Sequence, residues 1–116
     1  RLNTNLRLLK MHQKKGHTAG NRTVSVELSG LRVGDFVLTT FPGELTVPVG
    51  LNIKRTAKHP YVFVAGYTNG YVHYAPTAEQ LKNIGGAQED SDCMLAPEWQ
   101  RLYETRAVQM VRRLLR

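Results

Sequence analysis

The chain has 116 residues, of which 41% are hydrophobic and 22% charged, and its formal net charge at pH 7 is +7. This length suits one small globular domain with a single core, since domains of roughly 50 to 200 residues are usual. The one cysteine, Cys93, excludes an internal disulfide and a thiolate zinc cage, and no apolar run approaches the roughly 18 residues that a membrane-spanning helix needs.

Most of the basic excess lies at the N-terminus. Residues 1–22 contain six basic residues and no acidic residue, so 7 minus 6 leaves about +1 for the rest of the chain. Clustered cations are typical of nucleic-acid binding, but this segment has no aromatic residue on which a base could stack, so nucleic acid is not the expected partner. We expect residues 1–22 to form a flexible basic segment. It could bind an acidic partner or a membrane surface.

A strand pattern follows this segment. Residues 23–29 alternate between apolar and polar side chains, which predicts a half-buried strand, and Gly30 with residues 33–35 predicts a turn. The run from Phe36 to Phe41 is apolar or β-branched and predicts a more central strand, paired with the first as a hairpin.

Pro42-Gly43 should end that strand. Pro48 suits a first helical turn and residues 49–54 continue a short helix, after which residues 61–67 predict a third strand. Strand, helix and strand in this span favour a parallel crossover, whose two strands end at the same edge of the sheet. Glu44 and the segment Asn69–Tyr74 both leave from that edge.

Two more helices are predicted after the third strand. Residues 76–81 suit a short helix capped by Thr77, and Gly85-Gly86 opens a polar loop. From Pro97 to the C-terminus, apolar residues recur at helical spacing and arginines fill much of the remaining surface. The predicted fold class is α+β or α/β: a small mixed sheet with a parallel crossover, covered by two or three helices, with residues 23–116 as a single domain.

Two short motifs stand where apolar strands end: Phe41-Pro42-Gly43-Glu44-Leu45-Thr46 and Asn69-Gly70-Tyr71-Val72-His73-Tyr74. Together they resemble the metal-binding half of the neutral/alkaline ceramidase family, and the order of elements over about residues 28–115 is similar to its bacterial ceramidase-like branch. In that family a Pro-Gly-Glu turn supplies a zinc-binding glutamate, and an Asn-x-Tyr-x-x-Tyr segment supplies a tyrosine ligand. The resemblance therefore implies that Glu44 and Tyr74 are metal ligands, with a catalytic role for Tyr74.

These residue types suit the implied chemistry. Zinc accepts carboxylate oxygen, and a phenol can ligate the metal or hydrogen-bond to a developing oxyanion. From the residues alone, a glutamate before a helix is more often a cap or a dipole-complementing charge, so a structural role for Glu44 stays open. Tyr71 and His73 would point away from Tyr74 if the segment is extended, and we expect His73 to be a polar surface or hydrogen-bonded residue.

The resemblance also implies what the chain lacks. The family's two histidine ligands lie upstream of both motifs, and His12, His17 and His59 form no metal-ligand spacing. We therefore expect the C-terminal part of a larger zinc amidase, inactive alone, whose partner is the missing N-terminal part. Self-association through uncovered apolar surface is also expected.

The substrate class implied is a lipid-like N-acyl amide rather than ceramide in particular. The better-defined ceramidases carry another tyrosine about a helix beyond the ligand tyrosine, where this chain has Gly85, Gly86 and an acidic loop. A secreted or membrane-associated parent would follow from the resemblance, and the sequence leaves the compartment open. The alternative function is a non-catalytic basic interaction module.

Overall fold

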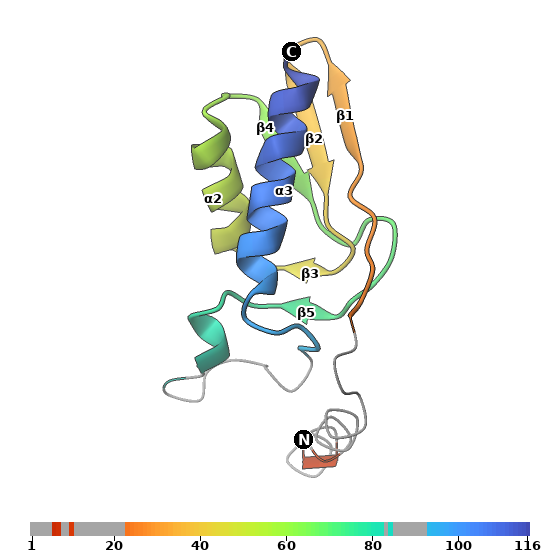
Figure 1. The fold of residues 1–116 in the computed structure, drawn as a ribbon, viewed down its shortest axis with the longest axis vertical. Coiled ribbons are helices and arrows are strands. Elements are labelled where there is room, and N and C mark those ends of the chain that lie inside the picture. Colours follow the sequence, from red (N-terminus) through yellow and green to blue (C-terminus); the bar gives the residue numbers. More distant parts are fainter. Residues whose placement is uncertain (1–5, 8–9, 11–22, 83, 85–92) are drawn as a thin grey trace.

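The computed structural model describes residues 6, 7, 10, 23–82, 84 and 93–116. Within them a three-stranded sheet has the order β1–β2–β4, and a second pair of short strands, β3 and β5, lies beyond its end (Figure 1). The fold is a mixed α+β arrangement, as the sequence predicted. The elements in chain order are β1 (Gly30–Val33), β2 (Phe36–Thr40), β3 (Glu44–Leu45), α2 (Val47–Ala57), β4 (Val62–Ala65), β5 (Tyr74–Ala75), the 3₁₀ turn η1 (Gln80–Lys82) and α3 (Trp99–Leu114).

The hairpin forms with a different first strand from the one predicted. β1 pairs antiparallel with β2 from Gly30↔Thr39 to Val33↔Phe36, and Gly34, with a φ of 59°, makes the tight turn. Residues 23–29 are not a strand, because β2 ends at Thr40 and leaves them no further ladder partner beyond the bond from Thr40 N to Ser29 O. The predicted alternation was therefore a pattern without a partner strand.

The strand–helix–strand unit is as predicted. β2 and β4 are parallel, in register from Val37↔Val62 to Thr40↔Ala65, and α2 connects them. Pro48 lies in the first turn of α2, where a missing N–H costs no hydrogen bond, and Lys58 ends the helix with a φ of 56°. Both strands thus finish at one edge, beside β3 and β5.

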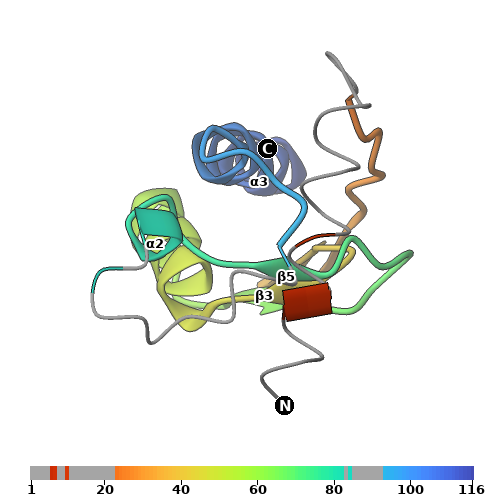
Figure 2. The ribbon, with the colours of Figure 1, turned by 90° about the horizontal axis from the view of Figure 1, so that it is seen from below.

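The core lies between the sheet and the helices α2 and α3. Val37 and Val62 of the sheet, Ile53 of α2 and Val111 of α3 are almost fully buried in it. α3, which the sequence predicted, runs across β1 and β2, where the Thr39 hydroxyl reaches the Met110 sulfur at 3.9 Å. α2 packs beside it and over β4 (Figure 2).

Aromatic residues fix the first half of α3 to the strand ends. Phe41 packs against Trp99 and Tyr103, with ring centroids 5.4 and 4.7 Å apart. The Trp99 indole donates to Pro76 O at 3.0 Å and the Tyr103 hydroxyl donates to Thr40 O at 3.1 Å. Burial raises the pKa of Tyr103, so this hydroxyl keeps its proton. The start of α3 is thereby tied to the edge where β2 and β5 end.

The segment after β5 is shorter as a helix than predicted. Only Gln80–Lys82 forms a 3₁₀ turn. Thr77 caps it as expected: Gln80 N donates to Thr77 Oγ1 at 3.0 Å, and Thr77 N donates to Gln80 Oε1 at 2.8 Å. The predicted loop from Gly85 and nearly all of the predicted basic segment 1–22 lie outside the described residues.

The sheet face turned away from α3 is apolar and exposed. Register places Leu31, Phe36, Leu38 and Phe63 on this face, and Phe36 stacks on Phe63 with centroids 4.8 Å apart. Leu31 is 53% exposed and Phe63 42%. Sheets with parallel strands are usually covered on both faces, so this exposed apolar face is unusual. The predicted self-association stays a prediction. In the part of the chain that the structure describes, no helix is long and apolar enough to cross a membrane.

The core contacts of α2 generate a stability prediction. Ile53→Ala should lower the free energy of unfolding by about 2–5 kcal/mol, because it leaves a cavity at a fully buried position. Leu51→Ala in the same helix is the control, since Leu51 is 47% exposed and its replacement should cost far less. Urea unfolding followed by circular dichroism measures both, and equal losses would contradict this assignment of the core.

Candidate functional site

The strand pair β3–β5 places the two sequence-predicted ligand residues side by side. β3 and β5 are parallel, and Glu44 and Tyr74 are direct register partners. Glu44 N donates to His73 O at 3.0 Å, and Thr46 N donates to Ala75 O at 3.4 Å. Residues 30 positions apart, counted as 74 minus 44, thus become neighbours across one ladder.

A tight backbone crossing positions this pair. The loop after β4 wraps around the Pro42–Gly43 turn through bonds from Tyr67 N to Gly43 O at 3.0 Å and from Val72 N to Pro42 O at 2.7 Å. A Cβ on Gly43 would lie 2.8 Å from His73 O, and one on Gly66 would lie 3.2 Å from Gly43 O. The Pro-Gly of the first motif is therefore needed for close approach of backbone to backbone.

The Glu44 carboxylate is held by tyrosine hydroxyls. The Tyr71 hydroxyl donates to Glu44 Oε1, and Tyr67 contributes a second, smaller hydrogen-bonding effect. These two donors, in that order, lower the pKa of Glu44, with a further small contribution from the nearby His73 and a small opposing one from desolvation. Desolvation and the negative Glu44 raise the pKa of Tyr67, whose side chain as a whole is 67% exposed. Glu44 is thus ionised and oriented.

The tyrosines reach Glu44 because the loop is not extended. Tyr67, Asn69 and His73 have φ values of 53°, 62° and 64°, and Gly70 has 137°. The segment from Asn69 to Tyr74 is therefore not fully extended, so the condition under which Tyr71 and His73 would point away from Tyr74 is not met. The Tyr71 ring lies 6.0 Å from that of Tyr67 and 5.1 Å from that of His73, centroid to centroid.

Sequence reasoning missed Tyr67 and set Tyr71 aside. A usable signal was present, because Tyr67 follows β4 directly and Tyr71 lies in the Asn-Gly turn at the same sheet edge. The left-handed residues that turn both rings toward Glu44 carry no signal of this kind, since three of the four are not glycine.

The donor set is chemically suited to zinc but incomplete. Glu44 has a carboxylate oxygen and His73 an imidazole nitrogen, both of which can ligate zinc. The Tyr74 phenol can ligate zinc or hydrogen-bond to a bound substrate. Among the described residues no cluster of three or more His, Cys, Asp or Glu side chains could hold a metal ion. Glu44, Tyr74 and His73 are therefore chemically compatible with part of a zinc site, and the described residues contain no complete one.

A buried hydroxyl adjoins this edge. Thr46, which precedes α2 and is 7% exposed, has its Oγ1 buried with no hydrogen-bond partner among the described residues. Leaving such a group unpaired costs about 1–3 kcal/mol. Thr46 directly follows β3, the strand that carries Glu44.

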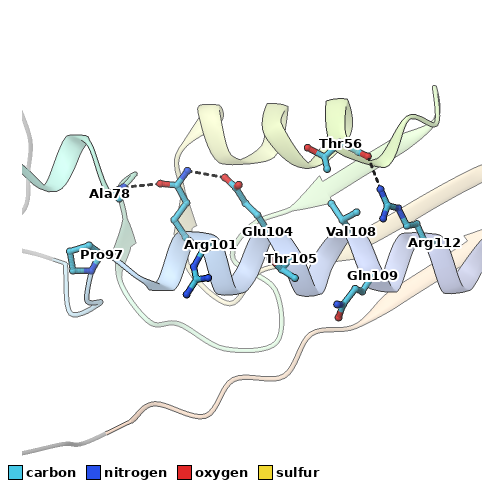
Figure 3. A pocket seen from close by; sticks show the side chains of 10 residues that line it. Thr56, Ala78, Pro97, Arg101, Glu104, Thr105, Val108, Gln109 and Arg112 are labelled. Atoms are coloured by element: carbon cyan, nitrogen blue, oxygen red, sulfur yellow. Dashed lines mark hydrogen bonds between the residues drawn. The ribbon is translucent and has the colours of Figure 1, made fainter.

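A separate cavity lies between α2 and α3. It has a volume of about 410 Å³, and Figure 3 shows Glu104, Val108 and Arg112 pointing from α3 toward α2. Its polar groups largely bond to one another: Gln100 donates to Glu104 at 2.8 Å and accepts from Ala78 N at 2.8 Å, and Arg112 donates to Thr56 O at 3.4 Å. The Arg112 bond joins α3 to α2, and the Ala78 bond joins α3 to the segment after β5, so we assign this cavity a structural role.

Comparison with known proteins gives one similarity in sequence. The chain is 36% identical over 70 residues to a neutral ceramidase of Mycobacterium tuberculosis, a match that covers 55% of this chain. It spans 11% of the length of that curated relative. No protein-family model and no solved structure matches the chain. A ceramidase-like relation is therefore indicated at a coarse level.

The backbone crossing generates a second prediction. Gly43→Ala should lower the free energy of unfolding by about 1–3 kcal/mol, because its Cβ would meet the His73 carbonyl and push β3 from β5. The control is Gly50→Ala in α2, where a Cβ meets nothing within 4 Å and should stabilise the helix by about 0.5–1 kcal/mol. Urea unfolding compares them; a neutral Gly43→Ala would argue against the tight crossing.

The hydrogen bond to Glu44 generates a third. Tyr71→Phe should raise the pKa of Glu44 toward its ordinary value, because the variant removes the main group that favours the carboxylate. A carboxyl group whose pKa is lowered on folding stabilises the folded state above its unfolded-state pKa, and this stability is lost as the pH falls through its folded-state pKa. Tyr71→Phe should therefore be less stable than the wild type at pH values above the unfolded-state pKa of Glu44, and equally stable at pH values below its folded-state pKa.

Carbon-detected NMR titration of the Glu44 carboxyl measures this pKa. Tyr61→Phe is the control, since Tyr61 is exposed and its ring packs against His59. Identical Glu44 titrations in the wild type and Tyr71→Phe would contradict the prediction.

Proposed function

We propose that this chain is the C-terminal part of a ceramidase-like, zinc-dependent amidohydrolase that cleaves an N-acyl amide bond. The observation that carries the proposal is the register pairing of Glu44 with Tyr74, because it joins the two motifs in which the chain resembles the neutral/alkaline ceramidase family. The similarity to the Mycobacterium tuberculosis neutral ceramidase supports the same reading independently of the geometry.

Glu44 and Tyr74 would hold the metal from one side of the site. Bound zinc supplies Lewis acidity and lowers the pKa of bound water to about 7. Glu44 would contribute negative charge that balances the metal, and its low pKa keeps it ionised for that task. Tyr74 would ligate the metal or donate a hydrogen bond to the oxyanion that forms when the amide carbonyl is attacked.

The proposal places the rest of the site in an N-terminal part of the parent protein, which would carry the two histidine ligands. This chain alone would then be inactive, and its natural partner would be that missing part. The substrate class is a lipid-like N-acyl amide, which fits the broader bacterial ceramidase-like branch and a role in lipid metabolism. The alternative is a basic module that uses residues 1–22 to bind an acidic partner or membrane surface; nearly all of this segment lies outside the described residues, so we propose the amidohydrolase on the motifs and the sequence similarity.

Metal analysis tests this function. The parent protein should retain about one zinc per chain after dialysis, Glu44→Ala should lose most of it, and this chain alone should hold little. Glu104→Ala is a matched control, since this glutamate lies between α2 and α3 and bonds to Asn52 and Gln100. Hydrolysis of a fluorogenic N-acyl amide by the parent, lost in Glu44→Ala and kept in Glu104→Ala, should follow the metal content. Absence of zinc from every form would reject the proposal and leave Glu44 a structural role.

A further inference from the structure

We propose that Tyr71, assisted by Tyr67, is a positioning residue that holds the Glu44 carboxylate in the orientation in which it ligates the metal. The inference rests on the proposed function and adds two residues to it. Both tyrosines come from the loop between β4 and β5, and both act on one carboxylate of β3.

Two tyrosines converge on the Glu44 carboxylate. The Tyr71 hydroxyl donates to Glu44 Oε1, Tyr67 acts on the same carboxylate, and the two rings stack with an interplanar angle of 13°. Each ring restricts the other, so the hydroxyl of Tyr71 has a defined place. A single surface tyrosine would lack this restraint and would orient a carboxylate weakly.

Burial in the core does not explain the positions of the Tyr67 and Tyr71 rings. Tyr67 is 67% exposed and Tyr71 is 51% exposed, so neither contributes much to the core. The backbone nevertheless adopts left-handed conformations at Tyr67, Asn69 and His73, which are uncommon for residues other than glycine. Such conformations persist where the surrounding structure enforces them, and they cluster at functional sites.

The Glu44 carboxylate can accept both tyrosine hydroxyls and still bind a cation. An ionised carboxylate has two oxygens with about four lone-pair sites in all, so two tyrosine donors leave room for a cation. Ligating carboxylates in metal sites are themselves hydrogen-bonded, and loss of such outer partners typically weakens metal binding by about 10–100-fold. Tyr71 and Tyr67 occupy that outer position relative to Glu44.

The test measures metal binding rather than activity alone. In the parent protein, Tyr71→Phe should weaken zinc affinity, measured by competition with a chromogenic chelator, by about 10-fold or more, and Tyr67→Phe by less. The visible absorption bands of the Co²⁺-substituted Tyr71→Phe protein should shift, because they report the ligand geometry. The melting temperature of the metal-free protein should fall only slightly, since the lost hydrogen bond joins two side chains near the surface, where such bonds contribute little to stability. Tyr61→Phe, which removes an exposed hydroxyl away from Glu44, should change none of these.

The outcomes separate this inference from the proposed function. Wild-type zinc affinity and Co²⁺ bands in Tyr71→Phe, with zinc lost in Glu44→Ala, would overturn the positioning role and leave the zinc site standing. A large fall in the melting temperature of metal-free Tyr71→Phe would also overturn it, because the hydroxyl would then be structural. Zinc retained in Glu44→Ala would overturn both.

Discussion

The backbone crossing of the Pro42–Gly43 turn and the 66–73 loop is the constraint on which the candidate site depends. Four backbone bonds join residues 41–44 to this loop. They run from Tyr67 N to Gly43 O, from Thr68 N to Phe41 O, from Val72 N to Pro42 O and from Glu44 N to His73 O. They begin the β3–β5 ladder and bring Glu44 level with Tyr74. Because Gly43 has no side chain, the strands approach closely enough for these bonds to form.

Two parts of the larger fold hold this crossing in place. The parallel pair β2–β4 delivers both segments to one edge, and α3 holds that edge through Trp99 and Tyr103, which bond to the carbonyls of Pro76 and Thr40. The opposite face of the sheet, with its stacked Phe36 and Phe63, takes no part in these contacts. Stability and the candidate site therefore share the same residues at the ends of β2 and β5.

The electrostatics of Glu44 connect this architecture to chemistry. A glutamate near the start of a helix usually caps the helix or complements its dipole, and Glu44 does precede α2. Its carboxylate instead takes the hydroxyl of Tyr71 from another element, so its orientation is set by tertiary structure. Glu44 makes no side-chain cap bond to α2 among the described contacts, and its role as a metal ligand belongs to the proposed function.

How much the sequence could predict differs between the strands, the helices and the site. Periodicity predicted α3, the short helix at Pro48 and the parallel pair, since burial of one face imposes a repeat that sequence displays. The same logic failed at residues 23–29, where alternation exists but no partner strand does. It also failed at Gly30 and Val33, which pair in β1 although a turn was expected there, whereas the turn at Gly34 and Asp35 is confirmed. Whether a segment forms a strand depends on a partner strand to which it can bond, and the local sequence does not specify that partner.

The sequence by itself determined the two motifs, the element order and the adjacency of Glu44 and Asn69–Tyr74 at one edge, because parallel strands must end together. Only the tertiary structure decided which tyrosines face Glu44. Left-handed conformations at Tyr67, Asn69 and His73 turn the loop, and they are enforced by hydrogen bonds to a turn more than 20 residues earlier in the chain. Local propensity disfavours those conformations, so long-range contacts alone could produce them.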